Sequence, residues 1–260
     1  MHAQTPSAKG RRDNRILGVR FDFIDYDEVL ATVRQWPLEA PSRCITITNP
    51  HSVLLCRSDE DMQKATCNAA LTLPDGVGVI LAARILGLRH QGRVTGPTLM
   101  LRLCDQGRAH GLRHFFYGGA EGVAKTLAER LTRQFPGLAV AGEYCPPFRA
   151  MTAEEDAQAV SRINEARPDI VWVGLGAPKQ EKWMAQHADR VAARALIGVG
   201  AAFDFHSGRV RWAPAWIRYI GMEWAYRLAQ EPRRMYGRNL NNLRFLAGVL
   251  GQRLFPSRRA

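Results

Sequence analysis

No apolar run in this sequence is long enough to cross a bilayer. The longest apolar window, Val77 to Leu88, is broken by Arg84 and falls short of the roughly 20 residues that a transmembrane helix needs. Residues 1–14 are polar and basic without an apolar stretch, which predicts a disordered basic arm and not a secretory signal peptide. We therefore expect a protein that does not span a membrane.

Cysteine is scarce and its spacing is irregular. The five cysteines include no Cys-x-x-Cys pair, a pattern that favours a reduced, cytosolic protein over a disulfide scaffold. The sequence also has no zinc-ligand spacing, no His-Glu-x-x-His motif and no Gly-x-Ser-x-Gly turn. These absences argue against the common zinc sites and against a serine nucleophile on a strand-to-helix turn.

Lysine and acidic residues are nearly absent after residue 206. Residues 207–260 hold eleven Arg, two Glu and no Lys or Asp, a net charge of +9 out of +12 for the whole chain. Trp and Tyr interleave with the arginines, and apolar residues recur at helical spacing on both sides of Pro232. We predict an α/β domain at 15–206 and a basic, aromatic, helical appendage at 207–260. The alternative is that these helices pack on the sheet as ordinary core helices.

Within 15–206 the pattern alternates between strands and helices. Strands are predicted at 43–48, 69–73, 114–117, 170–173 and 196–199, with a strand or hairpin at 15–24. Helices are predicted at 26–35, 78–87 and 123–133, and a further one begins at a Thr152–Glu155 capping box and ends near residue 166. Such alternation predicts a Rossmann-like, mainly parallel sheet covered by helices.

Asp75 follows a short apolar strand and precedes an apolar helix. Pro74 and Gly76 force a turn there, which places the carboxylate at the carboxyl end of a parallel strand. Open α/β sheets bind their ligands in that crevice. An Asp in this position also caps helices by accepting backbone N–H bonds. The residues alone leave both roles open.

Three other predicted strand ends carry small or polar residues. Thr48 and Asn49 end one strand, where Asn also serves as a turn former. Gly118 and Gly119 open a helix and could cradle a phosphate, but Tyr117 stands where the dinucleotide fingerprint has its first glycine.

The third strand end reads Gly-Leu-Gly-Ala-Pro-Lys-Gln-Glu-Lys, residues 174–182. Its glycines permit a tight turn, and Pro178 suits the first helical position. Lys179 and Gln180 then fall in the first helical turn, where they can bind phosphate and sugar hydroxyls. We expect Glu181 and Lys182 to be a solvated part of that turn.

Two charged residues outside these turns are also candidates. Arg93 lies next to a Gly-Pro turn, and its guanidinium can bind a carboxylate or a diphosphate with two hydrogen bonds, although an exposed loop Arg is the commoner case. Asp204 lies between Phe203 and Phe205 and either binds substrate or links the core to the appendage through an Arg.

In chain order, five segments resemble the WecG/TagA/CpsF glycosyltransferases, glycosyltransferase family 26. They are Asn49-Pro50, residues 74–78 (Pro-Asp-Gly-Val-Gly), residues 93–96 (Arg-Val-Thr-Gly), residues 174–182, and Phe203-Asp204 through residues 221–228 (Gly-Met-Glu-Trp-Ala-Tyr-Arg-Leu). The resemblance runs from about residue 15 to about residue 250. It implies an inverting, metal-independent enzyme that moves a sugar from a UDP donor to an undecaprenyl-diphosphate-linked sugar. The transferred sugar would be N-acetylmannosamine, its uronic acid or a glucose-type sugar.

The resemblance also implies roles for single residues. Asp75 would be the general base, Arg93 would contact the donor, Gln180 would supply an amide contact and Asn49 a strand-end contact. Where the family commonly has Thr, two residues before that Asn, this chain has Ile47. Further substrate-binding positions are predicted at Thr48, Gly76, Gly118, Gly119 and Asp204, and diphosphate-stabilising arginines at Arg211, Arg218 and Arg227.

The residues themselves also favour a site without a metal or another cofactor. Metal-dependent sugar-nucleotide transferases usually hold their ion with an Asp-x-Asp pair at a strand end. The only candidates here, residues 25–27 and 59–61, lie near or on predicted helices. A departing diphosphate without a metal needs cationic donors, which arginines can supply.

The expected partners are a UDP-sugar, a polyprenyl-diphosphate-linked sugar and an anionic membrane surface, with the protein peripheral on the inner face of the plasma membrane. The sequence leaves open whether the protein forms a homo-oligomer. One alternative is a Rossmann-type NAD-dependent oxidoreductase using residues 118–122 and Glu143, which the missing glycine and the Cys-Pro-Pro after Tyr144 disfavour. The other is a basic nucleic-acid-binding protein. We predict no nucleic-acid partner, because such a protein would not need a crevice that carries carboxylates.

Overall fold

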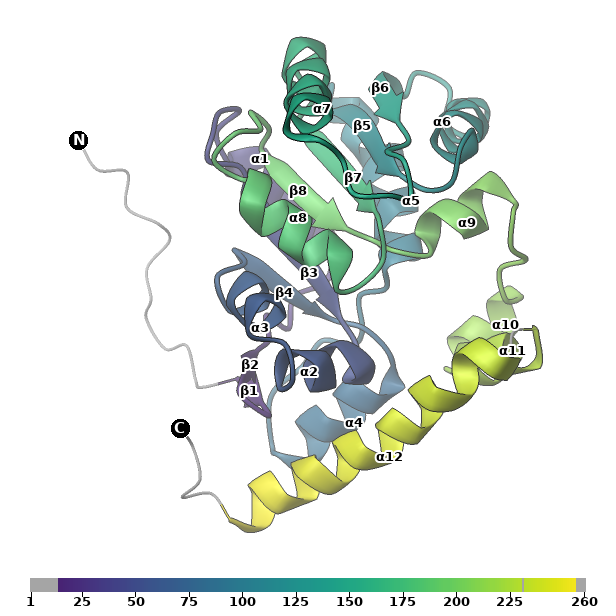
Figure 1. Cartoon of the computed structure of the whole chain (residues 1–260). Helices are drawn as coiled ribbons and strands as arrows, with labels where there is room; N and C mark the ends of the chain where they lie inside the picture. The colour runs from purple at the N-terminus through teal and green to yellow at the C-terminus, as the bar shows by residue number, and fades with distance from the viewer. Residues whose placement is uncertain (1–13, 231, 256–260) are drawn as a thin grey trace.

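The computed structural model describes residues 14–230 and 232–255, with only the backbone described for residues 233–240. The predicted arm of residues 1–14 lies outside this part except for its last residue. Six strands form one parallel sheet, which confirms the predicted parallel arrangement, and their order is β4-β3-β8-β7-β5-β6 (Figure 1). They are β3 (Arg43–Thr48), β4 (Leu71–Pro74), β5 (Arg113–Gly118), β6 (Ala139–Tyr144), β7 (Ile170–Gly174) and β8 (Ala195–Gly198).

Helices cover both faces of this sheet because its central strands are apolar on both sides. On one face, Trp172 and Ile197 pack against α1 (Tyr26–Gln35), α5 (Gly96–Gln106), α6 (Val123–Gln134) and α9 (Ala202–Ser207). On the other face, Val171 and Leu196 pack against α7 (Ala153–Ala166) and α8 (Lys179–His187). The predicted capping box at Thr152 is confirmed at the start of α7.

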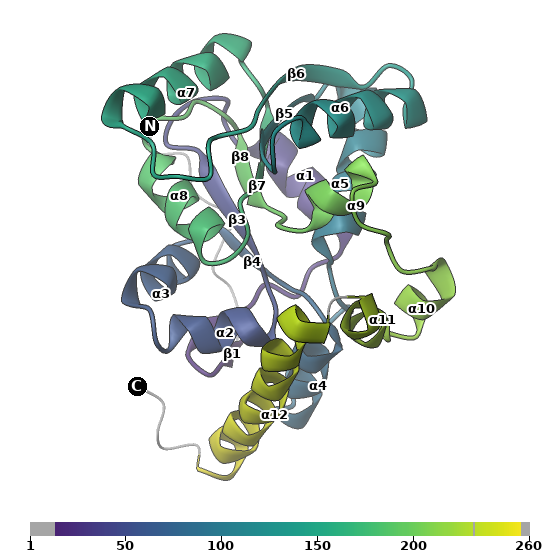
Figure 2. The same cartoon turned by 45° about the vertical axis from the view of Figure 1, so that its right-hand side comes forward.

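A third cluster lies beside the sheet and includes the last helix. It joins α2 (Pro50–Cys56), α3 (Glu60–Cys67), α4 (Val77–Ile85), α12 (Pro232–Leu254) and the small hairpin of β1 (Arg15–Ile16) and β2 (Val19–Arg20). Phe245 and Val249 of α12 are completely buried in this cluster. Figures 1 and 2 show α12 lying along α4 and beside α2. The last helix is therefore packed on the α/β body, and a domain boundary at 206/207 stays a prediction.

The outer side of β4 is covered by the segment that follows the hairpin. The Asp22 N–H donates to the Thr72 carbonyl at 2.9 Å, and the Asp22 carboxylate accepts from the Thr72 N–H at 3.0 Å. Arg20 pairs with the same carboxylate at 3.3 Å. One aspartate thus satisfies both backbone groups of Thr72 on the strand that leads to Asp75.

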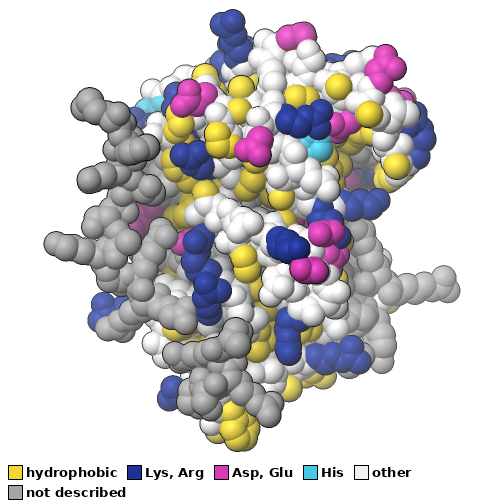
Figure 3. Space-filling view, turned by 60° about the vertical axis from the view of Figure 1, so that its left-hand side comes forward, with side chains coloured by type: hydrophobic (Ala, Val, Ile, Leu, Met, Phe, Trp, Pro, Cys, Tyr) yellow, Lys and Arg dark blue, Asp and Glu magenta, His cyan; other side chains and the backbone are white. Residues whose placement is uncertain are grey.

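Three short elements complete the described chain: a 3-10 turn (Gly107–His110), α10 (Ala215–Tyr219) and α11 (Glu223–Gln230). Of the helices in the described part, none combines the length and apolar character needed to span a bilayer. In Figure 3 the acidic side chains lie over the upper and middle parts of the visible surface, whereas its lower part carries basic and hydrophobic ones.

Candidate active site

The carboxyl ends of five strands open into one crevice with a volume of about 2020 Å³. It is lined on the sheet side by the residues that follow β3, β4, β5, β7 and β8, namely Asn49, Asp75, Gly119, Leu175 and Val199. The opposite wall comes from α4, α11 and α12 with Val77, Leu81, Trp224, Leu243 and Leu246. This is the place where open α/β sheets bind their ligands.

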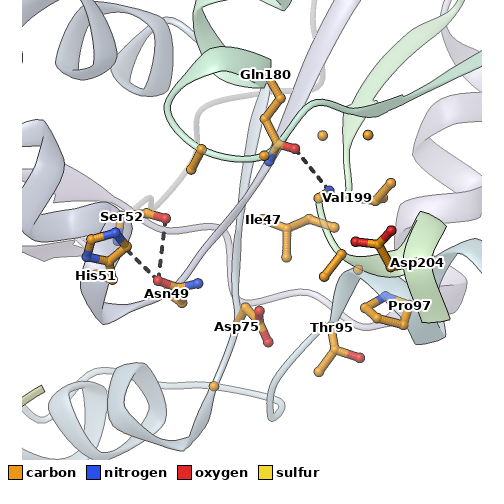
Figure 4. A pocket seen from close by; sticks show the side chains of 18 of the residues that line it. Ile47, Asn49, His51, Ser52, Asp75, Thr95, Pro97, Gln180, Val199 and Asp204 are labelled. Atoms are coloured by element: carbon orange, nitrogen blue, oxygen red, sulfur yellow. Dashed lines mark hydrogen bonds between the residues drawn. The ribbon is translucent and has the colours of Figure 1, made fainter. Parts of the chain in front are cut away.

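Asp75 lies low in this crevice, between Asn49 and Thr95 (Figure 4). Its backbone N–H donates to the Thr48 carbonyl at 3.0 Å, so the turn continues the pairing of β3 with β4. The N-cap of α4 is Gly76, with φ of 83°, and no side chain makes a capping hydrogen bond to the first turn of that helix. Asp75 precedes the N-cap and interacts with the Gly76 N–H, so it is not the N-cap residue of the helix-cap alternative, and it lines the crevice.

The surroundings of Asp75 raise its pKa from the ordinary 3.8 to about 6. Burial is the largest cause, and the negative charge of Glu223 adds to it, while Arg93, Arg227 and the Gly76 N–H act in the opposite direction. The side chain keeps partial exposure toward the crevice, with protein on its other sides. A reachable carboxyl group whose pKa lies near neutral pH suits a general base.

Two of the predicted arginines line the crevice together with Asp75. Arg93 donates from Nη2 to the backbone carbonyl of Arg218, which ties the loop before α5 to α10. Arg227 lies on α11 with its guanidinium 5.4 Å from the centre of the Phe205 ring. Both lower the pKa of Asp75, so both guanidinium groups lie close enough to act on charge in the crevice.

The other two predicted arginines lie outside the crevice lining. Arg218 is half-buried with its guanidinium 3.6 Å from the centre of the Trp212 ring, and its Nε donates to the Ala213 carbonyl at 2.9 Å. Arg211 is exposed. Of the three appendage arginines predicted to stabilise a diphosphate, the structure brings Arg227 alone to Asp75.

Thr48 does not reach the crevice, contrary to the prediction. Its hydroxyl is buried and donates to Thr46 at 3.5 Å, and Thr46 donates to Thr72 at 3.3 Å. Side chains alternate between the two faces of a strand, so Ile47 lines the crevice instead. Asn49 does line it, and also caps α2 by accepting from the Ser52 N–H at 3.1 Å, as its turn-forming alternative predicts (Figure 4).

Two of the three glycines predicted to bind substrate line the crevice, and the third lies where two strands pack closely. Gly119 and Gly76 line the crevice, and both have positive φ. Gly118 does not line it, because there β5 approaches β7 closely. A Cβ atom on Gly118 would lie 2.7 Å from the carbonyl carbon of Gly174. Asp204 lines the crevice and lies 3.8 Å from Arg209, which supports the predicted link to an Arg beyond the core.

Gln180 lines the crevice through a side chain that is already hydrogen-bonded at both ends. Its Oε1 accepts from the Gly200 N–H at 2.9 Å, and its Nε2 donates to Glu181 Oε1 at 2.9 Å. The expectation that Glu181 is solvated is wrong, because it is 2% exposed. Lys182 is half-buried and pairs with Asp59 of α3 at 2.8 Å. The packing of α8 against α3 explains why this turn is not free in solvent.

We expect Glu181→Gln to raise the free energy of unfolding at pH 7 by about 1 kcal/mol. Burial raises the pKa of Glu181 above its ordinary 4.5, and its Oε2 has no hydrogen-bond partner in the described part of the chain. A raised pKa means that the neutral form suits the fold, so stability is full below pH 4.5 and is lost as pH rises through the folded-state pKa. Urea unfolding at pH 7 and pH 4 measures the gain, which should shrink at pH 4.

The matched control is Glu129→Gln, the same change at an exposed position of α6. It should alter the free energy of unfolding by less than about 0.5 kcal/mol at either pH. A Glu181→Gln protein that is less stable than the unchanged protein at pH 7 would contradict the expected effect of the buried charge.

Glu223 is a crevice residue that the sequence analysis did not single out. It begins α11, and Trp212 Nε1 donates to its Oε1 at 3.3 Å. The sequence feature that could have identified it is the pair of opposite charges, Glu223 and Arg227, at helical spacing in an aromatic segment.

Among the described residues, no group of three or more His, Cys, Asp or Glu side chains is placed to hold a metal ion.

Comparison with known proteins gives a consistent set of matches. The profile of the glycosyl transferase WecG/TagA/CpsF family matches residues 14–259. An N-acetylglucosaminyldiphosphoundecaprenol N-acetyl-beta-D-mannosaminyltransferase from Bacillus spizizenii is 31% identical over 206 residues, which cover 79% of this chain and 78% of the relative. The protein of that name from Bacillus subtilis is 29% identical over 210 residues, covering 81% and 78%. The one from a strain of Staphylococcus aureus is 25% identical over 214 residues, covering 82% of each.

Proposed function

The chain belongs to the WecG/TagA/CpsF family of glycosyl transferases, and we propose that it moves N-acetylmannosamine from a UDP donor to a polyprenyl-diphosphate-linked sugar. The relatives are named for transfer of that sugar to N-acetylglucosaminyldiphosphoundecaprenol, which supports both the sugar and the acceptor class. The observation that carries the proposal is Asp75. It is a reachable carboxyl group with a pKa of about 6, in the crevice at the strand ends, with arginines beside it.

In the proposed reaction the Asp75 carboxylate removes the proton from an acceptor hydroxyl. The hydroxyl oxygen then forms a bond to the anomeric carbon of the donor on the face opposite the diphosphate. The bond from that carbon to the diphosphate oxygen breaks, and its electron pair leaves with UDP. A single displacement of this kind inverts the anomeric carbon.

The departing diphosphate needs positive charge, and the position of Arg93 and Arg227 in the crevice lining supports the proposal that they supply it. Both act electrostatically on Asp75, so both lie near the point where the acceptor oxygen would attack. Guanidinium groups bind diphosphate oxygens with paired hydrogen bonds. We therefore propose that charge stabilisation comes from these side chains and that the reaction does not depend on a divalent cation.

Release of UDP from UDP-N-acetylmannosamine, with and without a soluble analogue of the lipid-linked acceptor, tests the proposed function. We expect release only when the acceptor is present, and an equal rate after treatment with EDTA. Turnover of NAD with no UDP release would favour the oxidoreductase alternative. Loss of the rate in EDTA, restored by Mg²⁺, would contradict the proposed source of positive charge.

We also propose that α10 and the exposed side of α12 lie on an anionic membrane surface. Trp216 is 66% exposed, Tyr219 91% and Leu243 66%, and the exposed Arg244 lies next to Leu243. Exposed aromatic and apolar side chains together with arginines bind the interface of anionic bilayers. Because Leu243 also lines the crevice, the apolar chain of a lipid-linked acceptor would leave the crevice on this face.

Replacing Trp216 and Tyr219 together by Ser should reduce binding to anionic vesicles by about tenfold or more, since two exposed aromatic groups would no longer enter the interface. Co-sedimentation with vesicles that contain acidic lipids measures the effect. Thermal unfolding should not change, because both side chains are exposed. Leu38→Ser, at an exposed position far along the chain from α10, is the control and should bind as before. Equal binding by the double variant and the unchanged protein would rule out this face.

A further inference from the structure

Glu223 and Arg227 bring opposite charges to the same crevice from one face of α11. They are one helical turn apart, and both line the crevice that holds Asp75. Both act electrostatically on that carboxyl group, in opposite directions. The chain segment that delivers an arginine to the site therefore also delivers a carboxylate.

A hydrogen bond from Trp212 holds Glu223 in place. Trp212 Nε1 donates to Glu223 Oε1 at 3.3 Å. The Trp212 ring lies beneath the Arg218 guanidinium at 3.6 Å and against the edge of His206 at 5.0 Å. The indole N–H that holds Glu223 is uncharged, so this contact orients the carboxylate without neutralising it.

Positive charge in this crevice has two opposing effects on the proposed reaction. Arg93 and Arg227 would stabilise the departing diphosphate, but they also stabilise the Asp75 carboxylate and so weaken it as a base. A neighbouring negative charge reverses the second effect, because protonation of one carboxylate relieves the repulsion between the two.

We propose that Glu223 acts through Asp75, as a second carboxylate in the active site whose negative charge keeps Asp75 a strong base despite the neighbouring arginines. This inference rests on the proposed function, in which Asp75 takes the proton of the acceptor hydroxyl. Glu223 itself makes or breaks no bond. Its role is to hold a negative charge in the crevice near Asp75.

The charges around Asp75 support this assignment. Glu223 on α11 is the strongest charged group that raises the pKa of Asp75, and Arg93 before α5 and Arg227 on α11 are the charged groups that lower it. The other charged or titratable side chains that line the crevice come from β5, α2, α4, α8 and α9 and from the loops around them: His51, Arg84, His90, Tyr117, Arg149, Lys179, Asp204 and Arg209.

The test compares two variants on the same helix, Glu223→Gln and Arg227→Gln, by the pH dependence of kcat/KM. This profile reports the ionisation of the free enzyme, and its acid limb should lie near pH 6 for the unchanged protein. Glu223→Gln keeps an oxygen for Trp212 but removes the charge, so we expect the acid limb to move down by about half to one pH unit. Arg227→Gln should move it up, whatever its effect on the maximal rate.

Opposite shifts separate charge from structure, because a general disturbance of α11 would not change sign between the two variants. Glu223→Asp keeps the charge and should leave the acid limb close to that of the unchanged protein. An acid limb in Glu223→Gln that coincides with the original, or moves in the same direction as in Arg227→Gln, overturns the inference. Thermal unfolding of each variant establishes that it is folded, and if Glu223→Gln does not fold, Glu223→Met, which is of similar length and uncharged, takes its place and should also move the acid limb down. Normal turnover by Asp75→Asn would instead overturn the proposed function.

Discussion

Asp75→Asn is expected to lower the transfer rate by about 10² to 10⁴-fold, the usual loss when a general base is removed. Asn cannot accept the proton of the acceptor hydroxyl. The substitution removes no helix cap, because the N-cap of α4 is Gly76 and no side chain bonds there. Initial rates of UDP release with acceptor present measure the loss, and thermal unfolding measures stability.

The sign of the stability change follows from the raised pKa of Asp75. A carboxyl group whose pKa is about 6 in the fold and 3.8 ordinarily is least favourable to the fold when ionised, above pH 6. Asn is neutral, so the variant should be at least as stable as the unchanged protein at pH 7. Asp189→Asn, at an exposed position, is the control and should leave rate and stability unchanged. A folded Asp75→Asn protein with near-normal turnover would remove Asp75 from the role of base.

Phe245→Ala is expected to lower the free energy of unfolding by about 3–5 kcal/mol. Phe245 is completely buried on α12, in the cluster that includes Val53 of α2 and Val79 of α4, so its removal leaves a cavity. The free energy of unfolding of small domains is only about 5–15 kcal/mol, so this single change should remove a large fraction of it. Urea unfolding at constant pH measures it.

The matched control is Leu243→Ala, a truncation two residues away on the same helix. Leu243 is 66% exposed, so its loss should cost less than about 0.5 kcal/mol. If both variants lose the same stability, α12 is not packed as described.

The burial of Phe245 and Val249 also affects what a truncated protein can test, because a chain ending near residue 206 would lose both side chains and expose the cluster. Point variants on α10 are therefore the sharper test of membrane binding.

The parallel sheet could be predicted because its buried strands are continuous apolar runs between turn residues, such as residues 170–174. β6 was missed because each of its residues is only half-buried and small or polar residues interrupt it, as is common at a sheet edge. α5 was missed because it begins at Gly96-Pro97, a pair that also signals a turn. Pro is accepted in the first turn of a helix, where its missing N–H has no intrahelical partner to lose.

The strand ends of the crevice could be predicted for the same reason, but the direction of single side chains could not. Thr48 and Ile47 differ by one position, and that one step moves a side chain to the other face of the sheet. Glu181 lies next to Gln180, yet its burial depends on α3, a helix more than a hundred residues earlier. The effect of Glu223 on Asp75 likewise requires segments far apart in sequence to meet.

Asp22, which covers the outer side of β4, affects whether the sheets of two copies of this protein can join edge to edge. β4, the strand that leads to Asp75, is an edge strand of the sheet. The unpaired backbone groups of an edge strand can pair with a strand of another chain. Asp22 occupies both the N–H and the carbonyl of Thr72. Growth of the sheet from that side would first have to displace the backbone and side chain of Asp22, together with its partner Arg20. This edge of the sheet is thereby protected from aggregation by strand addition.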